Sequence, residues 1–214
     1  MLDVGMNFVY ATIVFFSGIL SRENGMESTP SDCLNTSPNI TSLARCLDTF
    51  TVPRGHYNAF TYGVAQPIGT QRQDWKTSLN TLLSIDGNCT LASVPPSLRG
   101  LYNIALFQDF CVLYETASRL GTYTKGWGFM IVPANRRDIS RSVHISAPHP
   151  KFDGTVQQAA SIFQSTGSRT LLVAGRTRDA FFSPSGCIQP TTGSQVYYKT
   201  DPVHNNVRVW GHIN

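Results

Sequence analysis

The stretch that most constrains the fold of this chain covers residues 143–179, where two strand-like segments flank a helical one. The first strand-like segment, residues 143–146, stops at Pro148, and His149 and Asp153 follow in a short polar turn. The second, residues 170–174, stops at Gly175 and is followed by two arginines. Two strand ends with polar residues just beyond them predict a site at the edge of an α/β sheet.

The helix between these strands is expected over residues 155–164. Thr155 is a suitable N-cap, and Gly167 lies just beyond the expected end. One face of this helix is apolar and collects Val156, Ala159, Ala160 and Phe163. The strand at 170–174 is apolar on both faces, which is typical of an interior strand in a sheet covered on two sides.

Other periodic segments add to this unit. Residues 71–83 place Trp75, Leu79, Leu82 and Leu83 on one helical face. Residues 101–117 alternate in part, which favours a single strand, although their length also suits a buried helix. A strand at 126–132 is expected to form a hairpin with 142–146 through a turn near Asn135. One or two strands are expected within residues 43–67, and a helix starts at Asp201-Pro202.

Composition indicates a secreted globular protein. Of 214 residues, 41% are hydrophobic and only 14% charged, and the net charge of +4 includes no concentrated basic stripe, so nucleic-acid binding is not expected. Residues 8–20 form an apolar run that is too short for a stable membrane span and suits a secretory leader. We therefore expect a leader at 1–21, a polar linker at 22–42 and a single α/β domain at 43–214. Three glycosylation sequons, at Asn35, Asn39 and Asn88, agree with secretion.

The chain has five cysteines and no C-x-x-C pair, which argues against a thiolate zinc cluster. In an oxidising compartment, Cys33–Cys46 and Cys89–Cys111 form a plausible pair of disulfides, although spacing alone leaves the pairing open. Cys187 is then left over. Its partner is expected in a C-terminal part that this chain lacks, so we expect a truncated protein.

A metal site is the central hypothesis for the strand ends. His149 and Asp153 lie four residues apart in one turn, and His204 would be a distant third ligand for Zn²⁺. Asp201 would orient a ligand histidine or cap the last helix. Arg176 or Arg178 would stabilise an oxyanion or hold a substrate carboxylate. Simpler alternatives exist for each residue. They are a turn role for His149, a turn or cap role for Asp153, a polar surface position for His204, a helix cap for Asp201, and solvent exposure for the two arginines.

Three short motifs carry a family resemblance that covers roughly residues 127–206. They are APHPKFDGT (147–155), AGRTR (174–178) and DPVHNN (201–206). Their order resembles that of secreted zinc amidohydrolase-like proteins of the phosphorylase/hydrolase-like fold. This group includes zinc carboxypeptidases, N-formylglutamate and polyglutamate hydrolases, and muramoyl-alanine amidases.

The resemblance implies a three-layer α/β fold, with a mixed sheet and helices on both faces. It also implies zinc ligands at His149, Asp153 and His204, an arginine at Arg178, and a small peptide-like or amide substrate. Two departures stand out. Thr177 occupies the histidine position of a Gly-x-His-Arg element, and no glutamate follows Glu115, which leaves Asp179 or Asp201 as the candidate base.

Two functions from different classes follow from these observations. The first is a secreted, metal-dependent hydrolase of amide bonds, in peptides or cell-wall fragments, whose activity is degenerate if Thr177 and the absent glutamate matter. The second is a non-catalytic secreted or cell-surface protein that keeps the scaffold and binds a ligand. A serine or cysteine hydrolase is disfavoured because the chain has no G-x-S-x-G motif.

Overall fold

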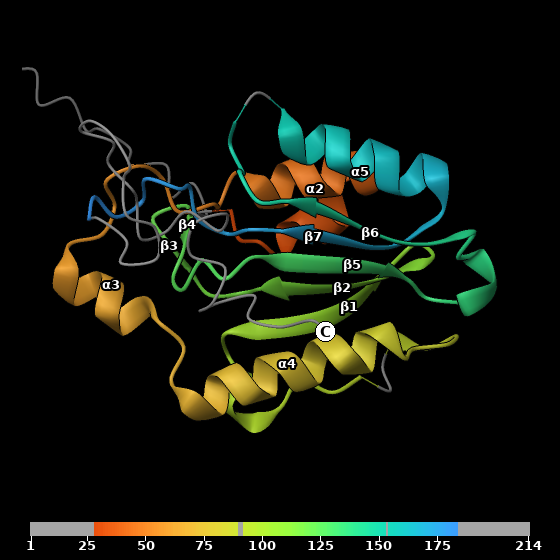
Figure 1. Cartoon of the computed structure of the whole chain (residues 1–214), viewed down its shortest axis with the longest axis horizontal. Helices are drawn as coiled ribbons and strands as arrows, with labels where there is room; N and C mark the ends of the chain where they lie inside the picture. The colour runs from red at the N-terminus through yellow and green to blue at the C-terminus, as the bar shows by residue number, and fades with distance from the viewer. Residues whose placement is uncertain (1–27, 90–91, 153, 184–214) are drawn as a thin grey trace, which may run out of the picture.

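A computed structural model describes residues 28–89, 92–152 and 154–183 of the chain. Its centre is a five-stranded mixed sheet in the order β1-β2-β5-β7-β6, in which β6 and β7 run parallel and the other neighbours antiparallel (Figure 1). The strands are β1 Tyr102–Phe107, β2 Phe110–Glu115, β5 Phe129–Pro133, β6 Arg141–Ala147 and β7 Ser168–Val173. A separate small hairpin pairs β3 Ser118–Arg119 with β4 Thr122–Tyr123.

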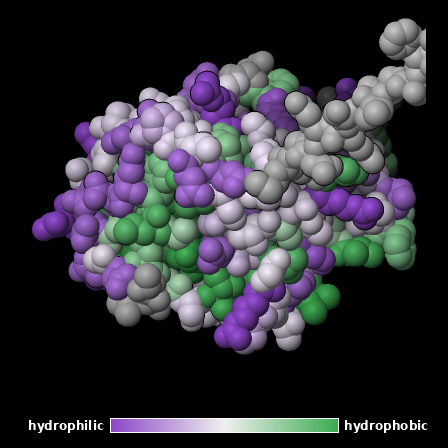
Figure 2. All heavy atoms as spheres, turned by 180° about the vertical axis from the view of Figure 1, so that it is seen from behind, coloured by the Kyte–Doolittle hydropathy of each residue, from purple (hydrophilic) through white to green (hydrophobic). Residues whose placement is uncertain are grey.

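Helices cover both faces of this sheet. Figure 1 shows α2 and α5 on one side, α4 on the other, and α3 at the end of the sheet that also carries β3 and β4. The helices are α1 Asp32–Thr36, α2 Ile40–Asp48, α3 Ala59–Ala65, α4 Gly69–Leu83 and α5 Thr155–Thr166, with short 3₁₀ turns η2 Pro96–Leu98 and η3 Arg136–Asp138. The expected mixed α/β architecture is confirmed. Figure 2 shows the reverse side, with hydrophobic groups at the right-hand margin, the end that carries α3.

The two-sided core follows from the alternation of side chains along a strand. On β2, Val112 and Tyr114 pack in the core beneath α2 and α5, whereas Cys111 and Leu113 pack in the core beneath α4. On β7, Leu171 and Val173 are fully buried, as expected for an interior strand. Each such fully buried apolar side chain contributes about 1.5–3 kcal/mol.

The β6–α5–β7 unit matches the sequence prediction, with one correction at its cap. Helix α5 ends at Thr166 and is followed by its C-cap, Gly167, which adopts the expected left-handed conformation with φ 57°. The N-cap, however, is Gly154 rather than Thr155. Thr155 is the first helical residue, and its hydroxyl donates a 2.7 Å hydrogen bond to the carbonyl of His149. The threonine therefore ties the preceding turn to the helix instead of capping a backbone N–H.

Two predicted strand arrangements were wrong. Residues 101–117 form two strands instead of one, because Gln108 has φ 51° and turns the chain between β1 and β2. The predicted hairpin between 126–132 and 142–146 does not form, because β7 lies between β5 and β6. Strand β6 is thus an edge strand, which explains why most of its residues are exposed.

Residues 43–67 form helices where strands were predicted. Asn39 caps α2 by accepting a hydrogen bond from the backbone N–H of Ser42, and Asn58 caps α3 in the same way through Thr61. Within 43–67, extended pairing is limited to an isolated bridge between Val52 and Arg176. The described part of the expected linker, residues 28–42, contains α1 and the start of α2.

Both predicted disulfides are present. Cys33–Cys46 joins α1 to α2, and Cys89–Cys111 joins the segment after α4 to β2. Cys187 and the expected leader lie outside the described residues.

The side chains of Asn35, Asn39 and Asn88 are exposed, as glycosylation would require. Among the described residues, no helix is long and apolar enough to cross a membrane.

Candidate functional site

A cavity of about 320 Å³ lies where β6 and β7 end. Parallel neighbouring strands bring their carboxyl ends to the same edge of a sheet, and α/β proteins commonly bind ligands there. The turn after β6 lines one side of the cavity, and the segment after β7 lines the other. The lining residues are Arg54, His149, Pro150, Lys151, Phe152, Thr177, Arg178 and Asp179.

His149 is held in this cavity by its own turn. Its carbonyl accepts the hydrogen bond from Thr155, which fixes the backbone directly before α5. The side chain is half-buried, and its Nδ1 atom is buried without a hydrogen-bond partner among the described residues. A buried polar atom without a partner costs free energy, so this nitrogen is a candidate for binding a ligand or an ion.

A buried aspartate, Asp48, holds the same turn through hydrogen bonds, and it was not predicted from the sequence. The Asp48 carboxylate accepts hydrogen bonds from the backbone N–H of Lys151, at 3.2 and 3.3 Å, and from the Thr51 hydroxyl, at 3.0 Å. Burial raises the pKa of Asp48 above its ordinary value. Lys151 has φ 56°, an unfavourable backbone conformation that its hydrogen bonds to Asp48 maintain. No local pattern marked Asp48, because residues 43–67 were predicted to contain strands and Lys151 lies 103 positions away in the sequence.

Positive charge predominates around the cavity. Arg178 is exposed, and its guanidinium carbon lies 5.4 Å from the ring centroid of Phe152. Arg54 pairs with Asp179, with 3.5 Å between Nε and Oδ2. Lys151 adds a third cation, and Asp179 is the only acid among the described lining residues, so the cavity suits an anionic ligand such as a carboxylate.

Arg176 points away from this cavity into the protein. Its side chain is buried, and its guanidinium donates 2.9 Å hydrogen bonds to the carbonyls of Lys125 and Ala65. The same group lies over the rings of Tyr57 and Tyr62, at 5.2 and 5.6 Å from their centroids. These contacts join the end of β7 to α3 and to the segment before β5.

Glu115, at the end of β2, is the buried counterpart of Arg176. Its carboxyl group accepts hydrogen bonds from the backbone N–H groups of Lys125 and Gly126 and from the Tyr102 hydroxyl. Burial raises the pKa of Glu115 from 4.5 to about 7, although these donors and the positive charge of Arg176 oppose the shift. No local pattern marks this group, because the N–H groups that it accepts from lie 10 and 11 residues later in the sequence.

The raised pKa of Glu115 predicts a pH-dependent stability. Between pH 4.5 and about 7 the folded protein holds a proton that the unfolded chain has released, so stability falls as the pH rises through this window. At the acidic end of this window, the raised pKa of Glu115 is expected to contribute about 3 kcal/mol to the free energy of unfolding. Urea unfolding across this range measures it, with Glu115→Gln as the reference that lacks the titrating group. Parallel pH profiles for the two proteins would contradict the assignment.

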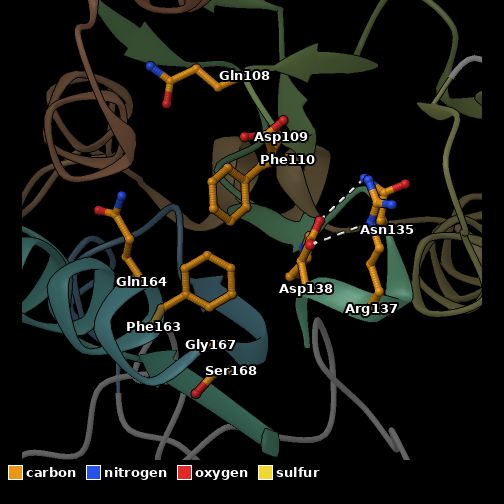
Figure 3. Close-up of a pocket in the computed structure, with 11 residues that line it drawn as sticks. Gln108, Asp109, Phe110, Asn135, Arg137, Asp138, Phe163, Gln164, Gly167 and Ser168 are labelled. Atoms are coloured by element: carbon orange, nitrogen blue, oxygen red, sulfur yellow. Dashed lines mark hydrogen bonds and ion pairs between the residues drawn. The ribbon is translucent and has the colours of Figure 1, made fainter. Parts of the chain in front are cut away.

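A second cavity, of about 440 Å³, lies at the opposite end of the sheet (Figure 3). It opens between the β1–β2 turn, η3 and the C-terminal end of α5. In Figure 3, Asp138 lies beside Asn135 and Arg137, and the rings of Phe110 and Phe163 face the space between these elements. Asp138 accepts a 3.3 Å hydrogen bond from Asn135 and pairs loosely with Arg137 at 3.9 Å. None of the residues predicted for the site line this cavity.

The structure brings together part of the predicted site. His149 and Arg178 line one cavity, and Thr177, at the histidine position of the resembled motif, lines it too. Asp153, Asp201 and His204 lie outside the described residues. Within the described part of the chain, no three His, Cys, Asp or Glu side chains are grouped as metal ligands.

Comparisons with family models, curated proteins and solved structures find no match for this chain.

Proposed function

We propose that this chain is a secreted, metal-dependent hydrolase of amide bonds with a phosphorylase/hydrolase-like scaffold, acting in the cavity at the ends of β6 and β7. The observation that carries the proposal is the meeting of His149 and Arg178 on one cavity, although 29 positions separate them in the sequence. A histidine with an unpartnered nitrogen beside an arginine combines a metal-ligand type with a carboxylate-binding group.

In this proposal, His149 holds Zn²⁺ together with Asp153 and His204. A bound zinc ion supplies a water acidified toward neutral pH and polarises a carbonyl. Arg178 binds a carboxylate of a peptide-like substrate, and the positive charge of Arg54 and Lys151 draws that anion into the cavity. Arg176 keeps the end of β7 in place, and Asp201 orients a ligand histidine.

The residues present fit this assignment in part. The buried Nδ1 of His149 is free of hydrogen bonds to the described residues, as a nitrogen available for a metal would be. Thr177 does not fit the assignment, because a threonine stands where the resembled motif has a histidine. Its hydroxyl donates a 3.2 Å hydrogen bond to the Val52 carbonyl.

Thr177 therefore favours a second candidate, a non-catalytic secreted or cell-surface protein that retains the hydrolase scaffold. Here the same cavity would bind an anionic ligand through Arg178 without cleaving it. The excess of positive charge around the cavity supports binding equally in both candidates, so only turnover separates them.

Zinc binding to the purified chain tests the first candidate. We expect one Zn²⁺ per chain in equilibrium dialysis, and we expect His149→Ala to weaken it by at least about 100-fold. His56→Ala, which removes an exposed histidine outside this cavity, is the matched control. Equal zinc affinity of His149→Ala and the wild type would contradict the ligand assignment.

Turnover of an N-acyl amino acid then distinguishes the two candidates. Zinc-dependent release of the amino acid that Arg178→Ala reduces supports the hydrolase. Binding of the same compound that depends on Arg178, with no product formed, supports the binding protein.

A further inference from the structure

A third cavity, of about 580 Å³, lies between α3 and the β3–β4 hairpin, away from the site described above. Its volume is in the range of small-molecule sites. Its walls carry three large apolar side chains that are mostly exposed: Phe60 at 78%, Val64 at 58% and Leu120 at 82%. Phe60 and Val64 are one helical turn apart on α3, so both lie on the side of the helix that lines the cavity.

Such a group of exposed apolar side chains is unusual on a folded surface. Single exposed apolar residues are common, but several around one hollow mark a binding surface. In Figure 2, hydrophobic groups gather at the margin that corresponds to α3.

Leu120 also adopts an unfavourable backbone conformation. With φ 52° at Leu120 and φ 67° at Gly121, the two-residue connection between β3 and β4 is a type I′ turn. This turn prefers asparagine or aspartate at its first position, because a branched apolar residue is strained at positive φ. A leucine that is both strained and exposed gives the fold no evident benefit, and such outliers are concentrated at functional positions.

The charge around the cavity has one sign. Arg119, Lys125 and His56 line it, and no acid is found among the described lining residues. Lys125 donates a 2.8 Å hydrogen bond to the Val64 carbonyl, which holds its ammonium group at the cavity. The Arg119 side chain makes no hydrogen bond or ion pair with the described residues, so its guanidinium is available to an anion.

Hydrogen bonds hold the residues at the base of the cavity in place. The Tyr57 hydroxyl donates to the Lys125 carbonyl at 3.3 Å, and Arg176 donates to that carbonyl and to Ala65. Three lining residues are thus joined to one buried guanidinium. A cavity with such a base is formed before a ligand arrives, which lowers the cost of binding.

We propose that this cavity binds a small monoanion with an apolar body, of the alkyl or aryl carboxylate class. The apolar body lies against Phe60, Val64 and Leu120, and the carboxylate pairs with Arg119 and Lys125. This proposal does not rest on the proposed hydrolase function, because none of these five residues lines the cavity that contains His149.

Calorimetric titration of the full chain with octanoate tests it. We expect saturable binding of one octanoate per chain, at least tenfold weaker binding of uncharged octanol, and no detectable binding of octylammonium. Arg119→Gln is expected to weaken octanoate binding about tenfold. Arg99→Gln, which removes an exposed arginine elsewhere, is the control and leaves binding unchanged.

The variant Leu120→Asn separates binding from folding. Asparagine fits the type I′ turn better than leucine, so the thermal midpoint should rise, whereas loss of the apolar contact should weaken octanoate binding by at least tenfold. The proposal is overturned if octanoate does not saturate, if octanol or octylammonium binds as tightly, or if neither Leu120→Asn nor Arg119→Gln weakens binding.

Discussion

Replacing Glu115 with leucine is expected to lower the free energy of unfolding by about 3–5 kcal/mol near pH 5. Leucine fills a similar volume, but it removes the acceptor for the backbone N–H groups of Lys125 and Gly126 and the partner of the Tyr102 hydroxyl. Because Glu115 is completely buried, water cannot replace these hydrogen bonds. Near pH 5 the wild-type group is protonated, so the cost of a buried anion does not offset the loss.

Urea unfolding at equilibrium measures this difference. Glu115→Gln keeps one acceptor oxygen and is expected to lose less stability than Glu115→Leu. Asp109→Asn is the matched acidic control, since Asp109 is exposed and its replacement should change stability by no more than about 0.5 kcal/mol. A loss below about 1 kcal/mol for Glu115→Leu would show that the two N–H groups find other acceptors.

The parts of the fold that the sequence predicted well are those in which local pattern and tertiary context agree. Helix α5 has an apolar stripe and a terminal glycine, and β7 is apolar on both faces because it is an interior strand. The hairpin between β5 and β6 failed because nothing local shows that a later strand inserts between two earlier ones. The turn at Gln108 was missed because neither it nor Asp109 is glycine or proline, the usual turn signals.

The sequence also predicted part of the arrangement of residues at this candidate site. The rule that polar residues beyond neighbouring strand ends converge correctly placed His149 and Arg178 on one cavity. It could not separate Arg176 from Arg178, although one is buried under two tyrosines and the other is exposed. Asp48 and Glu115 acquire their environments from residues 103 and 10–11 positions away, so no local pattern reveals them. The apolar cavity was missed because one or two strands were predicted within residues 43–67, whereas α3 forms there.

The two disulfides are expected to contribute about 3 kcal/mol each, chiefly by restricting the unfolded chain across separations of 13 and 22 residues. Small differences in loop length matter little, because the entropy depends on the logarithm of that length. Together the two bridges are comparable to the entire stability of many domains, so a variant that lacks both should be largely unfolded.

Paired alanine variants test each bridge, because its two cysteines are removed together and no new free thiol is left. We expect Cys89→Ala with Cys111→Ala to cost slightly more than Cys33→Ala with Cys46→Ala, since the former bridge closes the longer loop and its two cysteines are buried beneath α4. Cys187→Ser in every protein prevents thiol exchange. Free energies of unfolding, extrapolated from urea titrations, that differ from the wild type by less than about 1 kcal/mol would show that packing of α1 and β2, rather than the crosslinks, holds these segments in place.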